Sequence, residues 1–306
     1  MRLCAVSVDL DEIPNYFAIH GLAEPGGPEA SLVYDVAIHR LTQLADERRM
    51  PLTLFAIGSD LARPESAAKL RAARERGFEI ANHSLDHRYD FVRLGRSEVR
   101  RQVEAGADAV ERAVGERPVG FRAPGYTITD EVFEVLAELG VAYDSSVFPC
   151  PSYYAAKTAK IGAIALGGRR SRSIVDTPAV LLAPTRPYRI GRPYWRRGQG
   201  FRELPVQVTR GPRLPFFGTS ITMGGPRFAR VLARMCVGEP LVNLELHGID
   251  VLDAADGLEA LRPHQPDVRV PRERKLAALS AAFAELGAAG YAFVTLREAA
   301  DVIFKA

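Results

Sequence analysis

Apolar and polar positions follow two different periods along the first half of the chain. Short apolar runs typical of buried strands occupy residues 3–10, 52–58, 78–84 and 119–124, with a shorter one around Tyr143. The segments between them have apolar residues at every third or fourth position, which predicts helices at 29–49, 61–77, 97–115 and 129–140. Repeated strand and helix units of this kind favour a parallel sheet covered by helices.

This rhythm stops in the middle of the chain and then returns. Residues 150–225 are rich in Pro, Gly and Arg, with strand-like pieces at 173–181 and 203–208. A strand at 240–248, a helix at 271–290, a strand at 291–296 and a closing helix from Arg297 follow. We therefore predict an α/β fold, a distorted (β/α) barrel of about seven strands. Residues 1–306 would form a single domain, with an Arg/Pro/Gly-rich insertion at about 150–225.

The composition is that of an ordinary water-soluble protein. Hydrophobic residues make up 47% and charged residues 25%, and no apolar run is long enough for a membrane-spanning helix. The opening "MRLCAVSVDLDE" is unlike a secretory signal, so we expect a cytoplasmic protein. Three well-separated cysteines, Cys4, Cys150 and Cys236, argue against a disulfide framework and a thiolate zinc site, and we expect buried or incidental thiols.

Charge is mild overall but concentrated in one place. A net charge of +3 gives no indication of nucleic-acid binding. Residues 169–213, however, carry many arginines and almost no acids. Such a stretch is either solvated surface or a surface for phosphate, since guanidinium pairs well with it. A phosphate partner would be a nucleotide diphosphate, a lipid diphosphate or an anionic membrane surface, and the last two would make the protein membrane-associated.

Ionisable residues follow several of the predicted strands. They are Asp9, Asp11, His83, His87, Arg122 and His247. Taken singly, each has an ordinary explanation: a helix cap, a salt bridge, a hydrogen-bonded core histidine, or two histidines on one helical face. Because the carboxyl ends of parallel strands share one face of the fold, all six would converge there. This coincidence favours a functional site.

The chemistry of the six is compatible with a catalytic metal. Two imidazoles four residues apart and a carboxylate from another strand make a three-ligand site with an open position for water. This ligand set suits Zn²⁺ best, with Fe²⁺, Co²⁺, Ni²⁺ or Mn²⁺ as alternatives. A second carboxylate could accept the proton of that water, and a histidine on the opposite rim could protonate a leaving group.

Four short motifs resemble those of the polysaccharide deacetylases of carbohydrate esterase family 4. They are "SVDLDE", "HSLDH", "FRAPGY" and "LELHGID", in the order of that family. The first motif has one residue between its two acids, and this spacing resembles that of the branch that holds exosortase-associated deacetylases and lipid-linked formamido-arabinose deformylases. Other stretches typical of exosortase-associated members are echoed by "YDSSVFP", "RELPV" and "RLPFFG", and the resemblance extends from residue 3 to about residue 300.

The resemblance implies a role for each candidate residue. Asp11, His83 and His87 would hold the metal. Asp9 would be the general base, held by Arg122, and His247 the general acid. The backbone N–H of Gly125 would help to stabilise the oxyanion, and Tyr126 would line the sugar site in place of a tyrosine that the family often has at position 125. Asp86, between the histidines, would orient a ligand rather than bind the metal.

Two departures from the family pattern are visible. Glu12 stands where the family has glycine. The motif that orients the acid histidine is not recognisable; Glu203 or Asp176 could replace its acid, and Trp195 its aromatic residue.

The implied activity is metal-dependent removal of an N-acetyl or N-formyl group from an amino sugar, in a nucleotide-linked or lipid-linked precursor or a polysaccharide. The alternatives are a catalytically inactive sugar-binding barrel and a hydrolase of a non-sugar amide. The sequence leaves the sugar, the acyl group, the native metal and the oligomeric state open.

Overall fold

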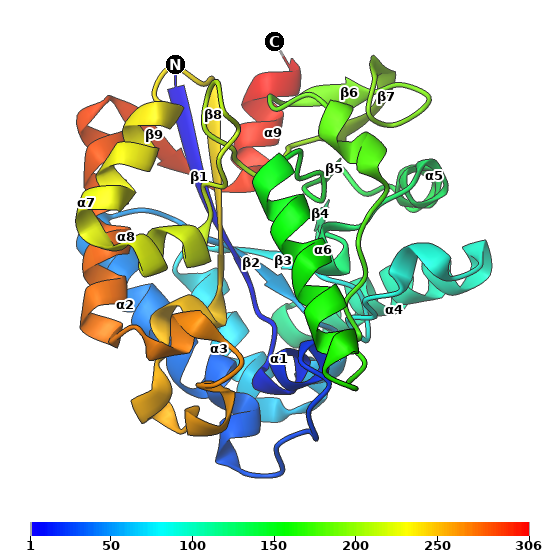
Figure 1. The fold of residues 1–306 in the computed structure, drawn as a ribbon. Coiled ribbons are helices and arrows are strands. Elements are labelled where there is room, and N and C mark those ends of the chain that lie inside the picture. Colours follow the sequence, from blue (N-terminus) through cyan, green and yellow to red (C-terminus); the bar gives the residue numbers. More distant parts are fainter. Residues whose placement is uncertain (1, 306) are drawn as a thin grey trace.

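The centre of the molecule is a curled sheet, seen in a computed structural model that describes residues 2–305 (Figure 1). Its strands are β1 (Arg2–Asp9), β2 (Thr53–Ala56), β3 (Glu79–Asn82), β4 (Gly120–Phe121), β5 (Tyr143–Asp144), β6 (Tyr188–Ile190), β7 (Arg197–Glu203), β8 (Leu241–His247) and β9 (Tyr291–Val294). The order across the sheet is β6-β7-β5-β4-β3-β2-β1-β8, and β9 pairs with the first half of β1. All pairs are parallel except β6 with β7. The predicted α/β barrel-like fold is confirmed, with nine strands in place of about seven.

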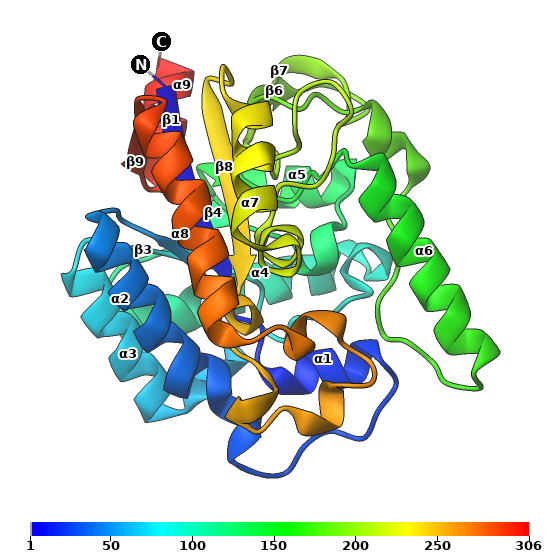
Figure 2. The same ribbon diagram turned by 60° about the vertical axis from the view of Figure 1, so that its left-hand side comes forward.

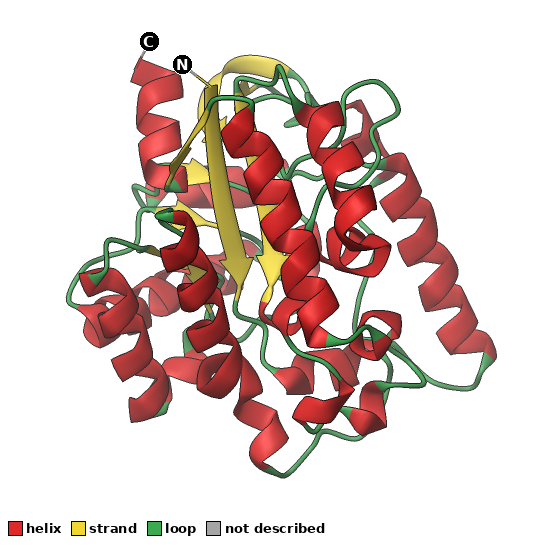
Figure 3. Ribbon diagram, turned by 90° about the vertical axis from the view of Figure 1, so that its left-hand side faces the viewer, coloured by secondary structure: helices red, strands yellow, loops and turns green. Residues whose placement is uncertain are grey.

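Helices surround the strands on the outside (Figure 3). They are α1 (Ile13–Ile19), α2 (Ile38–Arg48), α3 (Pro64–Glu75), α4 (Arg96–Val114), α5 (Asp130–Glu138), α6 (Pro151–Leu166), α7 (Gly218–Cys236), α8 (Arg272–Ala288) and α9 (Leu296–Lys305). In Figure 2, α7 and α8 lie side by side against β8 and β1. The helix predicted at 29–49 begins instead with a 3-10 turn at Pro28–Ser31 and a π turn at Val33–Ala37, which lead into α2.

The middle stretch differs most from the prediction. The strand-like reading of 173–181 is wrong, because this segment is irregular and ends in a 3-10 turn at Pro178–Leu182. Helix α6 was not predicted. Most of its residues are exposed, up to 92% for Leu166, so its sequence lacks the one-sided apolar stripe that marks a packed helix.

The same stretch also completes the wall of the barrel. Strand β7 pairs in parallel with β5. Past β7, Val206 N donates to Val147 O, just after β5, at 2.9 Å, and the next residue reaches β8, where Gln207 N donates to Asn243 O at 3.0 Å. The second strand-like piece, 203–208, therefore bridges two parallel strands that are not adjacent in the sheet order.

Side-chain alternation along β1 and β8 positions the polar residues. Val6, Val8, Leu244 and Leu246 belong to the core packed against the helices. The intervening residues face the other side, and the register pairs Ser7 with Glu245 and Asp9 with His247. The apolar alternation that builds the outer core therefore also lines the barrel mouth with ionisable groups.

The cysteines and the hydropathy of the helices can be compared with the predictions made from the composition. The three cysteines are buried and free, as expected. Within residues 2–305, no helix combines the length and the hydropathy that crossing a membrane requires.

Candidate active site and metal-binding cluster

Asp11, His83 and His87 converge at the mouth of the barrel. Oδ1 of Asp11 lies 3.3 Å from His83 Nε2 and 3.2 Å from His87 Nε2. All three side chains are buried. The histidines do not share a helical face: His83 directly follows β3, and the loop after it turns through left-handed backbone at Ser84 (φ 67°) and His87 (φ 48°). This turn brings the second imidazole back towards the first.

Neighbouring groups fix the orientation of both imidazoles. Nδ1 of His83 lies 2.7 Å from the carbonyl oxygen of Arg122, so it donates there and leaves Nε2 directed at Asp11. The hydroxyl of Ser84 accepts the backbone N–H of His87 at 3.2 Å, and the ring of Tyr89 stands edge-on to His87 at 4.7 Å. The ligand atoms are thus preorganised by the protein.

The cluster fits a divalent metal. Oδ1 of Asp11 and Nε2 of both His83 and His87 are buried, yet none has a hydrogen-bond partner. Buried polar atoms are rarely left unpaired, and three of them around one point are what a cation would satisfy. Burial raises the pKa of Asp11, but the two histidines outweigh it and hold this pKa well below its usual range, which keeps the carboxylate ionised.

Asp9 lies beside this cluster and is held by Arg122. Nη1 of Arg122 donates to Asp9 Oδ1 at 2.6 Å, and both side chains are buried. The guanidinium also donates to Ser7 Oγ and to the carbonyl and hydroxyl oxygens of Ser145, and it lies 4.1 Å from the centre of the Phe55 ring. Asp9 Oδ2 remains directed towards the cluster, 3.8 Å from His83 Nε2.

His247 lies at the end of β8, beside Asp9 on the neighbouring strand β1. Its Nε2 lies 4.0 Å from Asp11 Oδ2 and 3.4 Å from the hydroxyl of Tyr126. Its Nδ1 lies 2.9 Å from Oε1 of Glu245, a fully buried carboxylate two residues earlier on β8. Burial lowers the pKa of His247, but Glu245, Asp11 and Asp9 outweigh it and raise this pKa well above its ordinary value. The imidazole is therefore suited to carry a proton.

Comparisons with known proteins show similarity over part of the sequence and in the fold. Residues 27–143 match the sequence model of a family described as polysaccharide deacetylase. The match covers less than half of the chain. The matched segment contains His83, His87 and Arg122, whereas Asp9, Asp11 and His247 lie outside it. No curated protein matches the chain.

Solved structures of this family are similar along nearly the whole chain. A Mycobacterium smegmatis protein assigned to the polysaccharide deacetylases is 21% identical, with 99% of this chain and 91% of that chain covered and a TM-score of 0.61. The carbohydrate esterase domain of a xylanase from the hindgut metagenome of Trinervitermes trinervoides is 14% identical, with 97% and 88% covered and a TM-score of 0.50. A Bacillus anthracis family 4 pseudoenzyme is 12% identical, with 98% and 66% covered and a TM-score of 0.51. These likenesses show the fold, and the activity has to be argued from the site.

The structure gives His247 an acidic partner, Glu245, that could not be identified from the family motif. Glu203, one of the considered replacements, accepts the backbone N–H of Val147 instead. Asp176 accepts from the hydroxyl of Tyr194, and Trp195 packs edge-on against the same tyrosine. The sequence does indicate Glu245, because in "LELH" it is a carboxylate within an apolar strand, two residues before the histidine and therefore on the same side of the strand.

Glu12 also has a structural role at its unusual position. Its carboxylate accepts the backbone N–H groups of Val33 and Tyr34, both at 3.0 Å, and so ties the chain before α2 to the site loop. Burial raises its pKa to about 7. The carboxylate of Asp86 accepts from Gln102 Nε2 at 2.7 Å and makes no hydrogen bond with His83 or His87.

Gly125 and Tyr126 lie on the His247 side of the site. Gly125 adopts φ 65°, and its carbonyl oxygen accepts from Lys157 of α6 at 2.8 Å. Burial lowers the pKa of Lys157 to about 8. The ring of Tyr126 packs edge-on against Phe148, Tyr153 and His247. The proposed roles of Gly125 in oxyanion binding and of Tyr126 in sugar binding stay predictions.

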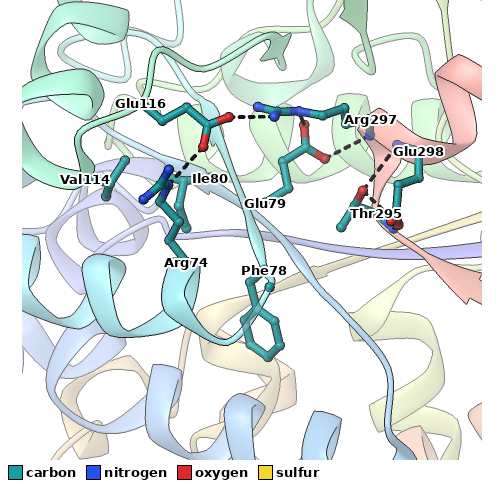
Figure 4. Close-up of a pocket in the computed structure, with 10 residues that line it drawn as sticks. Arg74, Phe78, Glu79, Ile80, Val114, Glu116, Thr295, Arg297 and Glu298 are labelled. Carbon is teal, nitrogen blue, oxygen red and sulfur yellow. Dashed lines mark hydrogen bonds and ion pairs between the residues drawn. The ribbon is translucent and has the colours of Figure 1, made fainter.

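Two cavities adjoin His87, and a third is remote. One of about 950 Å³ extends from His87 to residues 170–175, and one of about 430 Å³ extends towards Glu12 and Asp60. The third cavity, of about 410 Å³, lies at the start of β3 and contains none of the predicted site residues (Figure 4). There Arg297 lies between Glu79 and Glu116. These charges face one another, so this cavity offers no free cationic group to a ligand.

Proposed function

We propose that the protein is a metal-dependent hydrolase that removes an N-acetyl or N-formyl group from an amino sugar. The observation that carries this proposal is the unpaired Asp11, His83 and His87 cluster lying next to both Asp9 and His247 at one barrel mouth. These three residues would hold the ion, and their mixed carboxylate and imidazole donors suit Zn²⁺ best, with Fe²⁺, Co²⁺, Ni²⁺ or Mn²⁺ as alternatives.

The metal would supply Lewis-acid polarisation of the acyl carbonyl and a lower pKa for water in the site. Asp9 is placed to accept the proton of the attacking water, because Arg122 occupies its Oδ1 and leaves Oδ2 on the side of the cluster. Attack forms the bond from the water oxygen to the acyl carbon. The amide C–N bond then breaks.

His247 would donate a proton to the departing nitrogen, which is otherwise a poor leaving group. Glu245 holds Nδ1 of this imidazole, so Nε2 is the atom directed into the site. The products are acetate or formate and a free amino sugar. The Asp-x-Asp spacing supports the branch of the family that includes exosortase-associated deacetylases and formamido-arabinose deformylases.

Removal of the metal is expected to abolish turnover reversibly. The purified protein should contain about one divalent ion per chain, since three ligands define a single site. Incubation with dipicolinate should remove the ion and stop release of acetate or formate from N-acyl amino sugars, and added Zn²⁺ should restore both. A His83→Ala variant should lose metal, with Glu239→Gln, a carboxylate paired with Arg186 away from the site, as the control.

The alternatives give different results in the same assays. Metal and sugar binding without release of any acyl product would indicate an inactive sugar-binding barrel. Release from small cyclic or linear amides, with none from N-acyl sugars, would indicate a hydrolase of non-sugar amides. Full activity of the metal-free protein would contradict the proposal altogether.

Glu245 is expected to act as a positioning residue for His247. Replacing Glu245 with Gln should lower kcat by about 10- to 100-fold and leave KM and metal content nearly unchanged, because the imidazole loses its charged partner but the metal ligands are untouched. Steady-state kinetics and metal analysis measure these effects. An unchanged kcat, or a loss of thermal stability that accounts for the loss of activity, would contradict the assignment, and Glu239→Gln again serves as the control.

A further inference from the structure

The largest cavity at the site extends well beyond the catalytic residues. Its volume of about 950 Å³ begins at His87 and reaches the loop of residues 169–175 that follows α6. We call this loop the arginine loop. Cavities of a few hundred to about 1,000 Å³ hold ligands of drug size, so there is room for a group attached to the sugar as well as for a sugar ring.

The acids that line this cavity have partners, whereas some of its arginines do not. Its two acids already have cationic partners: Asp90 accepts from Arg88 at 2.8 and 3.0 Å, and Asp86 lies 3.6 Å from Arg101 and accepts from Gln102 at 2.7 Å. Four arginines also line it, and two of them, Arg93 and Arg170, have no side-chain hydrogen bond or ion pair with any residue in 2–305. The unengaged charge of the cavity is therefore positive.

Arg172 adds a third nearly free guanidinium on the arginine loop. Its only acidic neighbour within the described part of the chain is Glu24 at 3.5 Å, and the arginine side chain in that contact is 70% exposed. An ion pair so exposed is worth little, so Glu24 does not compete strongly with an incoming anion.

The arginine loop is fixed to the end of α1 and the residues that follow it. The backbone N–H of Arg172 donates to Ala18 O at 3.2 Å, and Arg169 Nη1 donates to His20 O at 3.1 Å. A side chain at Gly21 would place its Cβ 2.7 Å from Arg170 O, so the loop packs directly on that glycine. The backbone that carries Arg170 and Arg172 is thus held in place before any ligand binds, which lowers the entropic cost of binding.

The smaller cavity on the other side of His87 has no such excess of unpaired positive charge among the described residues. It is lined by Glu12, Asp60 and Asp86, with Arg63 as its basic residue. Arg63 is paired with Asp35 at 2.9 Å. An anionic group on the substrate would therefore be directed to the side of the arginine loop.

We propose that the larger cavity is a subsite for a phosphate group carried by the amino-sugar substrate, with Arg170 and Arg172 pairing with that phosphate and Arg93 adding to the positive field. The planar guanidinium fork matches phosphate oxygens and can bind two of them at once. This inference rests on the proposed function for the identity of the sugar. The phosphate is either that of a nucleotide diphosphate sugar or that of a lipid-linked sugar.

Binding tests the subsite without requiring turnover. Isothermal titration of the metal-loaded protein should show UDP-N-acetylglucosamine and N-acetylglucosamine 1-phosphate binding more tightly than N-acetylglucosamine. Arg170→Ala with Arg172→Ala should weaken binding of the phosphate compounds by about tenfold and leave that of the plain sugar unchanged. Arg196→Ala with Arg227→Ala removes the same charge from exposed positions outside the cavity and is the control.

The two sources of phosphate are separated by comparing UDP-N-acetylglucosamine with a short-chain polyprenyl diphosphate N-acetylglucosamine in detergent. Whichever shows the larger loss in the Arg170 and Arg172 double variant is the source that the subsite recognises. Equal affinity for phosphorylated and plain sugar, or equal weakening by the control pair, would overturn the subsite. Phosphate-dependent binding without acyl release would uphold the subsite and count against the proposed hydrolysis.

Discussion

An Asp9→Asn variant is expected to keep its metal and its fold but to release acyl product about 10²- to 10⁴-fold more slowly than the wild type. The amide can still accept the hydrogen bond that Arg122 donates to Asp9 Oδ1, so the geometry of the site should persist. It can no longer take a proton from water. Metal analysis and kcat measured on the same preparation test the two halves of this prediction.

His247→Ala is the companion variant for the proposed acid. It should also retain metal, because Nε2 of His247 lies 4.0 Å from the nearest oxygen of Asp11 while the three proposed ligands are untouched. Turnover should fall for lack of a proton donor to the leaving nitrogen. Full activity of both variants would contradict the base and acid assignments, and loss of metal from Asp9→Asn would make Asp9 a ligand rather than a base.

Much of this site could be predicted from the sequence because it is built on strand ends. Asp9 and His247 each end an apolar run, and apolar alternation fixes which side of a strand each residue faces. Parallel pairing then brings the two ends together, as the register of Asp9 with His247 shows. His83 could be placed in the same way because it directly follows β3.

What could not be predicted depends on contacts between residues far apart in sequence or on irregular backbone. The return of His87 towards His83 needs left-handed backbone at a serine and a histidine, which no apolar period indicates. The middle of the chain joins β5 to β8 through single hydrogen bonds rather than through a regular strand. Its sequence therefore has only a weak apolar alternation from which a strand could be predicted.

Glu245 was missed for a different reason. The family motif predicts that the acidic partner of His247 lies in the middle of the chain, which favoured Glu203 and Asp176. The partner that the structure shows lies two residues away on the histidine's own strand. A buried carboxylate needs a partner, so a charged residue in an apolar strand is by itself a reason to examine its neighbours on the same face.

Arg122→Met is expected to lower the free energy of unfolding by about 3–5 kcal/mol, besides removing activity. Methionine fills much of the volume, but Asp9 becomes a buried carboxylate without its cation. Ser7 Oγ and the carbonyl oxygen of Ser145 also lose the N–H groups that they accept. Urea denaturation of the metal-free proteins measures the change, since bound metal would add its own stabilisation.

The same substitution in the Asp9→Asn background separates the ion pair from the packing. In that background a neutral amide has replaced the carboxylate. Arg122→Met should therefore lower the free energy of unfolding by about 2 kcal/mol less than in the wild type, a coupling of the size found for residues in one buried network. Asp86→Asn, which changes a carboxylate that contacts Gln102 and not Arg122, should leave the cost of Arg122→Met unaltered. Equal costs in all three backgrounds would show that the arginine acts through its other contacts and that Asp9 is not held by it. A large coupling would instead show that the strand-end carboxylate and the buried guanidinium form one unit, in which the charge needed to activate water is maintained by the core of the barrel.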